Sequence, residues 1–194
     1  MNRRPFLAAL GCAVLLTWMR PAQSSGTIEV EQARLEVSGP DNLVLLSADF
    51  VVSLTATLQD AVNRGLPLYF LTEVLVERGR WYWFDETVVE TQIEWRLSYH
   101  ALTRQFRVAA NGRSDSFGSL EEALAAMSSV KRWLVAPLSR FEKRSVYEVW
   151  VRMRLDTTRL PKPFQMTALT DRDWNPQSEW KRFDFTVPTP TSAR

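Results

Sequence analysis

The residues best suited to binding a ligand lie together between positions 78 and 86. The charged and aromatic side chains of this candidate binding site are Arg78, Arg80, Trp81, Trp83, Asp85 and Glu86. Because alternate residues of a strand point to opposite faces, the four consecutive rings at 81–84 would lie on both faces. One interpretation is a ligand or partner surface with some rings exposed. The other is a scaffold with both faces covered, since aromatic residues also build cores.

Residues for covalent or acid–base catalysis are few. Outside the first 24 residues the only histidine is His100, at the end of a predicted strand, which is typical of a surface or turn residue. No serine lies in a Gly-x-Ser-x-Gly elbow, so no nucleophilic triad can be assembled. Three acids, Asp85, Glu86 and Asp156, leave a carboxylate-based hydrolase of envelope glycans as an alternative. The sequence therefore identifies no catalytic residue.

Metal ligands are equally sparse. Asp171, Asp173 and Asn175 resemble the start of a calcium loop, but Pro176 stands where the loop needs glycine and Arg182 where it needs a closing glutamate. We expect a solvated turn there. No zinc spacing is present, and we predict neither a metal site nor a cofactor.

The N-terminus reads as an export signal. Arg3 and Arg4 precede an apolar run over 6–18 and a small-x-small site at 22–24. We predict a signal peptide over residues 1–24 and a periplasmic protein, with an uncleaved anchor as the alternative. The run falls short of the roughly 20 residues that span a membrane, which favours cleavage. We favour export by the Sec route. Because the arginines are paired, export by the twin-arginine route is the alternative.

The composition of the chain after residue 24 limits the classes of partner that it could bind. Loss of residues 1–24 leaves 21 basic and 22 acidic residues and removes the only cysteine, Cys12. A near-neutral chain lacks the basic stripe that a nucleic acid needs, so we expect no nucleic-acid partner. A chain without cysteine holds no disulfide or thiolate metal site.

Strand patterns dominate the rest of the chain. The clearest alternate with a period of two over 87–99 and 147–155, and weaker ones cover 28–37, 43–52, 68–78, 105–109 and 182–187. Long one-sided strands without repeated strand–helix alternation predict a mainly β fold, an antiparallel β-sandwich or a strongly bent sheet with two short packed α-helices. We predict a single domain over 25–187 and a disordered tail at 188–194.

Two segments have helical signals. Ser119 and Glu122 form a capping box, and apolar residues at helical spacing extend that helix to Leu134, before Pro137. A second helix is predicted from about Thr55 to Arg64, where Gly65 suits a left-handed C-cap.

Several blocks together resemble a family of Gram-negative bacteria, domain of unknown function 4390. The blocks are Gly65–Phe70, Arg80–Trp83, Leu97–Tyr99, Gln105–Val108, Phe117–Leu124, Arg154–Asp156, Leu160–Pro163 and Trp174–Trp180. The resemblance implies an exported protein of no established activity, whose genes are often found near a membrane sensor kinase and its response regulator. It supplies no catalytic residues. Family members commonly have Trp-Arg before a Ser-x-Trp in the last block, where this chain has Trp174-Asn175-Pro176-Gln177-Ser178-Glu179-Trp180.

These observations favour a non-enzymatic binding or accessory protein of the bacterial envelope, associated with a membrane signalling system. The aromatic–arginine segment and Leu160–Pro163, a rigid edge or docking loop, motivate this hypothesis. An envelope protein is the expected partner, peripheral membrane association is open, and the ligand is unknown. Besides the hydrolase, a second alternative to the binding protein is a lipid or small-ligand carrier. Its cavity would lie between the sheets and be lined by Phe70, Trp95 and Trp150.

Overall fold

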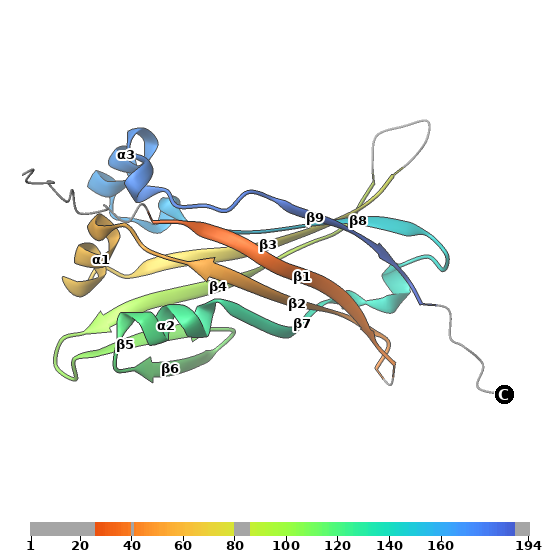
Figure 1. The fold of residues 1–194 in the computed structure, drawn as a ribbon, viewed down its shortest axis with the longest axis horizontal. Coiled ribbons are helices and arrows are strands. Elements are labelled where there is room, and N and C mark those ends of the chain that lie inside the picture. Colours follow the sequence, from red (N-terminus) through yellow and green to blue (C-terminus); the bar gives the residue numbers. More distant parts are fainter. Residues whose placement is uncertain (1–25, 40, 80–85, 189–194) are drawn as a thin grey trace, which may run out of the picture.

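The described part of the chain is a two-layer antiparallel β structure (Figure 1). A computed structural model describes residues 26–39, 41–79 and 86–188. Its strands are β1 (Ile28–Ser38), β2 (Leu43–Val52), β3 (Leu68–Arg78), β4 (Glu86–His100), β5 (Gln105–Ala110), β6 (Arg113–Phe117), β7 (Ser129–Pro137), β8 (Val146–Leu155) and β9 (Lys181–Thr186). Its helices are α1 (Ala56–Asn63), α2 (Leu120–Met127) and α3 (Lys162–Thr170). The predicted mainly β, sandwich-like class is confirmed.

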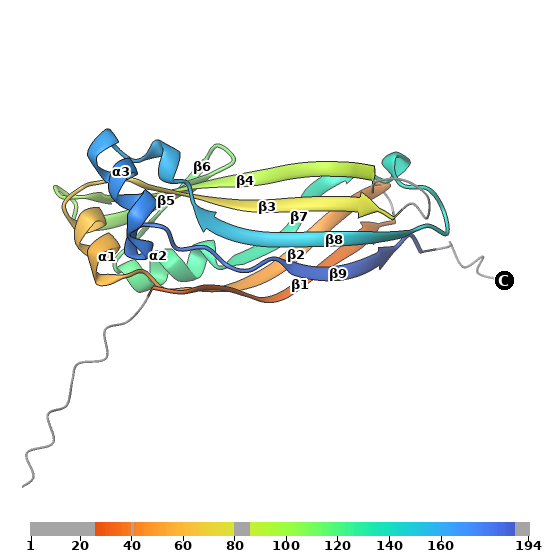
Figure 2. The same ribbon diagram turned by 90° about the horizontal axis from the view of Figure 1, so that it is seen from above.

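Two sheets of unequal size form the layers. The smaller has the order β1-β2-β7 and the larger the order β6-β5-β4-β3-β8-β9, with every neighbouring pair antiparallel. Figures 1 and 2 show the three α-helices gathered at one end of the sandwich, while the described chain ends at the opposite end. We call the opposite end (Figure 1), which has the short 3-10 helix Leu138–Arg140 but no α-helix among the described residues, the helix-free end.

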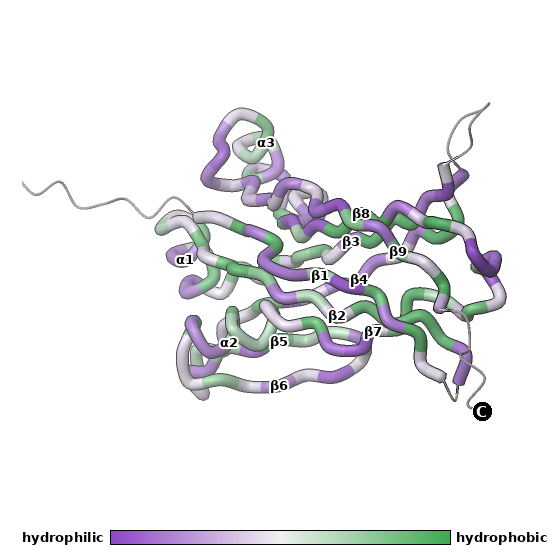
Figure 3. Tube along the Cα trace, turned by 45° about the vertical axis from the view of Figure 1, so that its right-hand side comes forward, coloured by the Kyte–Doolittle hydropathy of each residue, from purple (hydrophilic) through white to green (hydrophobic). Residues whose placement is uncertain are grey.

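Alternation along the strands separates the core from the outer face of the larger sheet. In β8 the odd residues from Tyr147 to Leu155 are buried and the even ones are half-buried or exposed, and Figure 3 shows this hydropathy alternation along the strands. Phe70, Val74 and Val76 of β3 pack on the same core. Glu73 of β3 therefore lies on the outer face, beside the even residues of β8.

Local caps explain where two helices begin. Ser119 Oγ accepts a hydrogen bond from the Glu122 N–H (3.1 Å), as the predicted capping box requires. Thr55 Oγ1 accepts one from the Leu58 N–H (3.2 Å), and Gly65 follows α1 with a φ of +92°. The predicted N-cap at Ser119 and the predicted left-handed residue at Gly65 are confirmed, and the N-cap at Thr55 is an additional finding.

The predicted extension of the helix that begins after Ser119 as far as Leu134 is wrong. α2 ends at Met127, and residues 129–137 form strand β7 on the edge of the smaller sheet. The apolar residues Val130 and Val135 fit a strand as well as a helix, and pairing with β2 decides between them. Tertiary pairing here overrides a local helical spacing.

Two elements escaped prediction. The segment Leu160–Pro163, expected as a rigid edge or docking loop, instead leads into α3, with Pro161 at the N-cap and Pro163 in the first turn. β6 is polar and exposed, and so lacks a hydrophobic alternation. It pairs with β5 through a turn at Asn111 and Gly112, both at positive φ, the geometry that an Asn-Gly hairpin favours.

Three predictions concern residues that the structure does not describe. The signal peptide over 1–24 and residues 189–194 of the predicted tail lie outside the described residues, as do Arg80, Trp81, Trp83 and Asp85 of the candidate binding site. Among the described residues, no helix has the length and apolar character needed to cross a membrane.

Candidate functional site

Arg78 and Glu86, the two described members of the predicted binding site, lie together at the helix-free end. They are ladder partners, the last residue of β3 and the first of β4, and their side chains form an ion pair. A second ion pair joins Arg78 to Glu142, in the connection between β7 and β8. We call this three-residue arrangement the Arg78 clamp, because it ties the base of the β3–β4 hairpin to that connection.

The Arg78 guanidinium at the centre of the clamp is charged at any physiological pH. Hydrogen bonds to Glu142 and then Glu86 raise the pKa of the Arg78 guanidinium above its ordinary value, against a smaller opposing effect of desolvation. Arg78 is 21% exposed, whereas Glu142 is 67% exposed. The clamp therefore holds the connection in place through a well-solvated pair that salt can screen.

Beside the clamp, a half-open pocket of about 640 Å³ lies at the helix-free end. Four separate segments line this end pocket: the end of β1, the β1–β2 turn, the β7–β8 connection and the chain after β9, with Val37, Gly39, Asn42, Leu138, Ser139, Phe141, Lys143, Val187 and Pro188. Its volume falls within the range of small-molecule sites, roughly 300–1,000 Å³. Its lining is mainly apolar, which suits the apolar part of a ligand or partner.

Aromatic packing fixes one wall of the end pocket. Phe141 is buried and meets Tyr147 and Phe185 edge-on, with centroid distances of 5.1 and 5.7 Å. The Tyr147 hydroxyl oxygen accepts a hydrogen bond from the Glu142 N–H (2.5 Å). The connection is thus anchored at Phe141 by packing and at Glu142 by both its backbone and its carboxylate.

Three cations lie in the β7–β8 connection, which forms one side of the end pocket. Lys143 lines the pocket, and Arg140 and Arg144 are exposed in the same short connection. None of the three has an ion pair within the described ranges 26–39, 41–79 and 86–188. An apolar wall beside unpaired cations suits a molecule that joins an apolar group to an anionic one.

The residues proposed for a cavity between the sheets do not share one. Phe70 is fully buried in the core. Trp95 is half-buried and donates its indole N–H to Thr72 Oγ1 (3.1 Å). Trp150 lies on the outer face of the larger sheet, where Arg182 sits 5.4 Å from its ring centroid. Trp95 lines a pocket of about 500 Å³ between strands β4–β5 of the larger sheet and β7 of the smaller one. The end pocket, with its mainly apolar lining, is a second candidate for a carrier site.

The described acids of the hydrolase hypothesis do not form a pair. Glu86 adjoins one end of β3, whereas the Asp156 N–H donates to the Tyr69 carbonyl oxygen (2.7 Å) near the other end. A strand rises about 3.3 Å per residue, which places the two acids about 30 Å apart. Paired carboxylates in glycosidases lie within about 10 Å of each other. Asp85, the third acid, lies outside the described residues.

The remaining candidates occupy surface positions. His100 is the exposed last residue of β4, with Nδ1 3.2 Å from Thr103 Oγ1. Where a solvated turn was expected, Arg172–Trp174 form a short 3-10 helix in which an Asp171 carboxylate oxygen accepts a hydrogen bond from the Asp173 N–H (2.9 Å); both aspartates are exposed, but Trp174 is buried. Among the described residues, His, Cys, Asp and Glu do not gather in a group of three that could hold a metal ion.

Sequence reasoning found the clamp partners Arg78 and Glu86 but missed the end pocket. Its lining comes from segments up to 150 residues apart, so no local spacing marks it. The one local signal is Phe141 between basic residues, in Arg140-Phe141-Glu142-Lys143-Arg144.

Fold and site define an antiparallel two-sheet protein with an open, apolar pocket at one end. The chain belongs to the family described as domain of unknown function (DUF4390), whose model matches residues 25–184. The resemblance noted in the sequence is thereby confirmed. No curated protein and no solved structure matches the chain.

Proposed function

We propose that this protein is an exported, non-enzymatic binding or accessory protein of the bacterial envelope, and that the end pocket is its binding site. The observation that carries the proposal is the end pocket itself: about 640 Å³, mainly apolar, with Lys143 at its opening. The Arg78 clamp and Phe141 hold the connection that forms one side of it. A preformed apolar surface of this kind favours association because little ordering is needed on binding.

Family resemblance adds a candidate partner, a membrane sensor kinase. A periplasmic domain of such a kinase would approach the helix-free end with an apolar side chain and an acidic neighbour, which Phe141 and Lys143 complement.

Photocrosslinking in the native host tests the partner. A photoreactive residue at Ser139, exposed on the end pocket, is compared with one at Leu102, which is 93% exposed in the β4–β5 turn. We expect a discrete crosslinked product in the envelope fraction from Ser139 and none from Leu102. Equal products from both positions, or none from Ser139, would contradict the proposal.

A small amphiphile is the second candidate for the same pocket, favoured by Lys143 in its mainly apolar lining and by Arg140 and Arg144 in the same connection, none of which has an ion pair among the described residues. Native mass spectrometry of the gently purified protein tests it. Retained mass that disappears in Ser139→Trp, which fills the opening, supports a carrier. The matched control is Ser116→Trp on the exposed strand β6, which should keep the added mass. A bare-chain mass for the unmodified protein excludes a retained ligand.

A further inference from the structure

Another pocket lies on the outer face of the larger sheet and shares no lining residue with the end pocket. Its centre is Glu73, which accepts hydrogen bonds from two arginines of β8. Arg152 Nε bonds to one carboxylate oxygen, and Arg154 bonds to the other from Nη2 (2.8 Å) and Nε (3.1 Å). The Glu73 side chain is 17% exposed and each arginine 26%.

The segment before β9 places Trp180 over one of these arginines. Buried Ser178 exchanges two hydrogen bonds with the backbone of Met153: its N–H donates to the carbonyl oxygen (2.8 Å), and its Oγ accepts from the N–H (3.0 Å). This holds the chain against β8, and the Arg152 guanidinium carbon then lies 4.2 Å from the Trp180 ring centroid. The guanidinium of Arg152 is thus held by the hydrogen bond from its Nε to Glu73 and by stacking of one face on the Trp180 indole.

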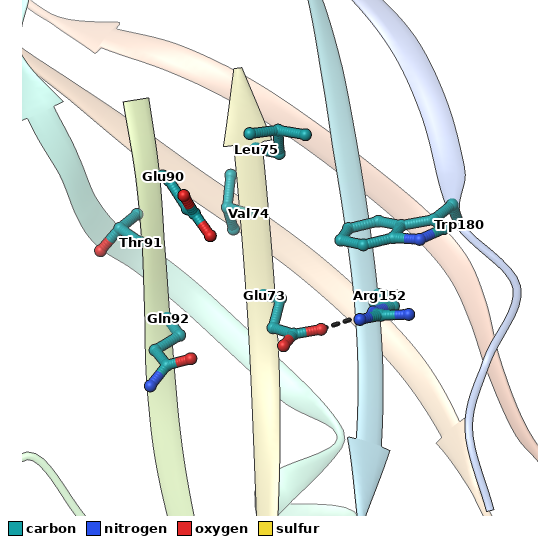
Figure 4. Close-up of a pocket in the computed structure, with 8 residues that line it drawn as sticks. All are labelled: Glu73, Val74, Leu75, Glu90, Thr91, Gln92, Arg152 and Trp180. Atoms are coloured by element: carbon teal, nitrogen blue, oxygen red, sulfur yellow. Dashed lines mark hydrogen bonds and ion pairs between the residues drawn. The ribbon is translucent and has the colours of Figure 1, made fainter. Parts of the chain in front are cut away.

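The terminal amino groups of Arg152 have no acceptor among the described residues. Figure 4 shows that part of the guanidinium directed away from Glu73. A guanidinium with its plane already set and two amino groups open is arranged for a bidentate bond to a carboxylate. Because both supports exist before binding, a ligand meets a side chain that has already lost its rotational freedom.

An acidic side faces this cation across a pocket of about 270 Å³. Glu73 and Leu75 of β3 form its floor, Arg152 and Trp180 one side, and Glu90 and Gln92 of β4 the other (Figure 4). β4 and β8 flank β3, so the two sides are separated by two strand spacings, about 10 Å between backbones. Glu90 is exposed and has no ion pair in the described part of the chain.

We propose that this outer pocket binds a short zwitterionic peptide of about dipeptide size. The carboxylate would bind the amino groups of Arg152, the ammonium group would face Glu90, and the side chains would contact Leu75 and Trp180. The volume is below that of drug-sized sites, which start at roughly 300 Å³, so the ligand is small. The proposal does not depend on the end pocket, because no residue lines both.

Calorimetric titration of the purified protein with dialanine tests this site. C-amidation of dialanine should weaken binding about tenfold or more, since it removes a charge-assisted bond. N-acetylation should weaken it about two- to fivefold, as for an exposed ion pair. Dialanine that does not bind, an amide that binds as well as the acid, or inorganic phosphate that binds in its place overturns the proposal.

Two arginine variants locate the binding. Arg152→Met should weaken dialanine binding about tenfold or more, whereas Arg154→Met should leave it within twofold. Arg154 is the matched control because it bonds to the same carboxylate and has the same exposure, yet does not line the outer pocket. Glu90→Gln, at an exposed position, gives a variant that should fold normally and bind about two- to fivefold more weakly. Equal effects of the two arginine variants, or no effect of Glu90→Gln, would refute the assignment.

Discussion

Strand β3 carries two ion-pair networks of opposite composition. At its end Arg78 lies between two glutamates, and in its middle Glu73 lies between two arginines. Arg152 is the ladder partner of Glu73 and Arg154 follows on the same strand, so sheet register sets the Glu73 network. Only one partner of Arg78 is fixed by the ladder, because Glu142 belongs to a connection.

Exposure separates the two networks further. All three side chains around Glu73 are at most 26% exposed, while Glu86 and Glu142 are 38% and 67% exposed. Water and salt screen an exposed pair more than a partly buried one. We therefore expect the Glu73 network to stabilise the sheet, whereas the Arg78 clamp positions a connection that packing already holds.

Removal of the Phe141 ring should destabilise the protein most, and it tests whether packing holds the connection. Phe141→Ala should lower the free energy of unfolding by about 3–5 kcal/mol, because it leaves a cavity against Tyr147 and Phe185. Chemical denaturation measures the loss, and Phe141→Leu, which keeps most of the volume, should lose much less. A loss below about 1 kcal/mol for the alanine variant would mean that ions, and not packing, anchor the connection.

Removing the charge of Glu73 should have the next largest effect. Glu73→Gln should cost about 1–2 kcal/mol, the lower part of the range for hydrogen bonds to charged groups, because solvent partly screens the network. Glu90→Gln on the neighbouring strand is the control, and it should change stability by less than about 0.5 kcal/mol. Equal losses in the two variants would place Glu73 among ordinary surface charges.

Acidification should remove the same contribution gradually. Burial opposes ionisation of Glu73, but hydrogen bonds and charges of Arg154 and Arg152 outweigh it and hold its pKa below the ordinary 4.5. Its stabilising effect is therefore complete above about pH 4.5 and is lost as pH falls through the lower pKa of the folded protein. Unfolding curves of the unmodified chain and Glu73→Gln should converge below pH 4.5. A stability difference that grows on acidification would reverse the sign and contradict the assignment.

The smallest effect on stability is expected at the clamp. Arg78→Met should destabilise the protein less than Glu73→Gln does, and the difference from the unmodified chain should vanish in 1 M salt. Hydrogen exchange should instead become faster around Glu142 and Tyr147, where the clamp holds the connection. Arg140→Met, in the same connection but without an ion pair among the described residues, should leave exchange there unchanged. A global loss as large as that of Glu73→Gln would erase the contrast between the networks.

Sequence reasoning succeeded where the signal is local. The alternation over 87–99 corresponds to β4 (Glu86–His100), Ser119 caps α2 as its capping box predicts, and Gly65 follows α1 at a positive φ as predicted. It failed at β7, where apolar spacing fits two structures, and at α3, whose prolines suggested a loop. In both cases the neighbouring elements, and not the segment itself, select the conformation.

The candidate sites divide along the same line. The residues alone were enough to predict the one-sided strands, the turns, the family resemblance and the choice of Arg78 and Glu86 as site residues, because each depends on residues close in the chain. The tertiary structure adds that Arg78 pairs with both Glu86 and Glu142, that Trp180 covers Arg152, and that four distant segments line the end pocket. Strand order and register bring these residues together, and both follow from burial of the whole core, which no short segment encodes.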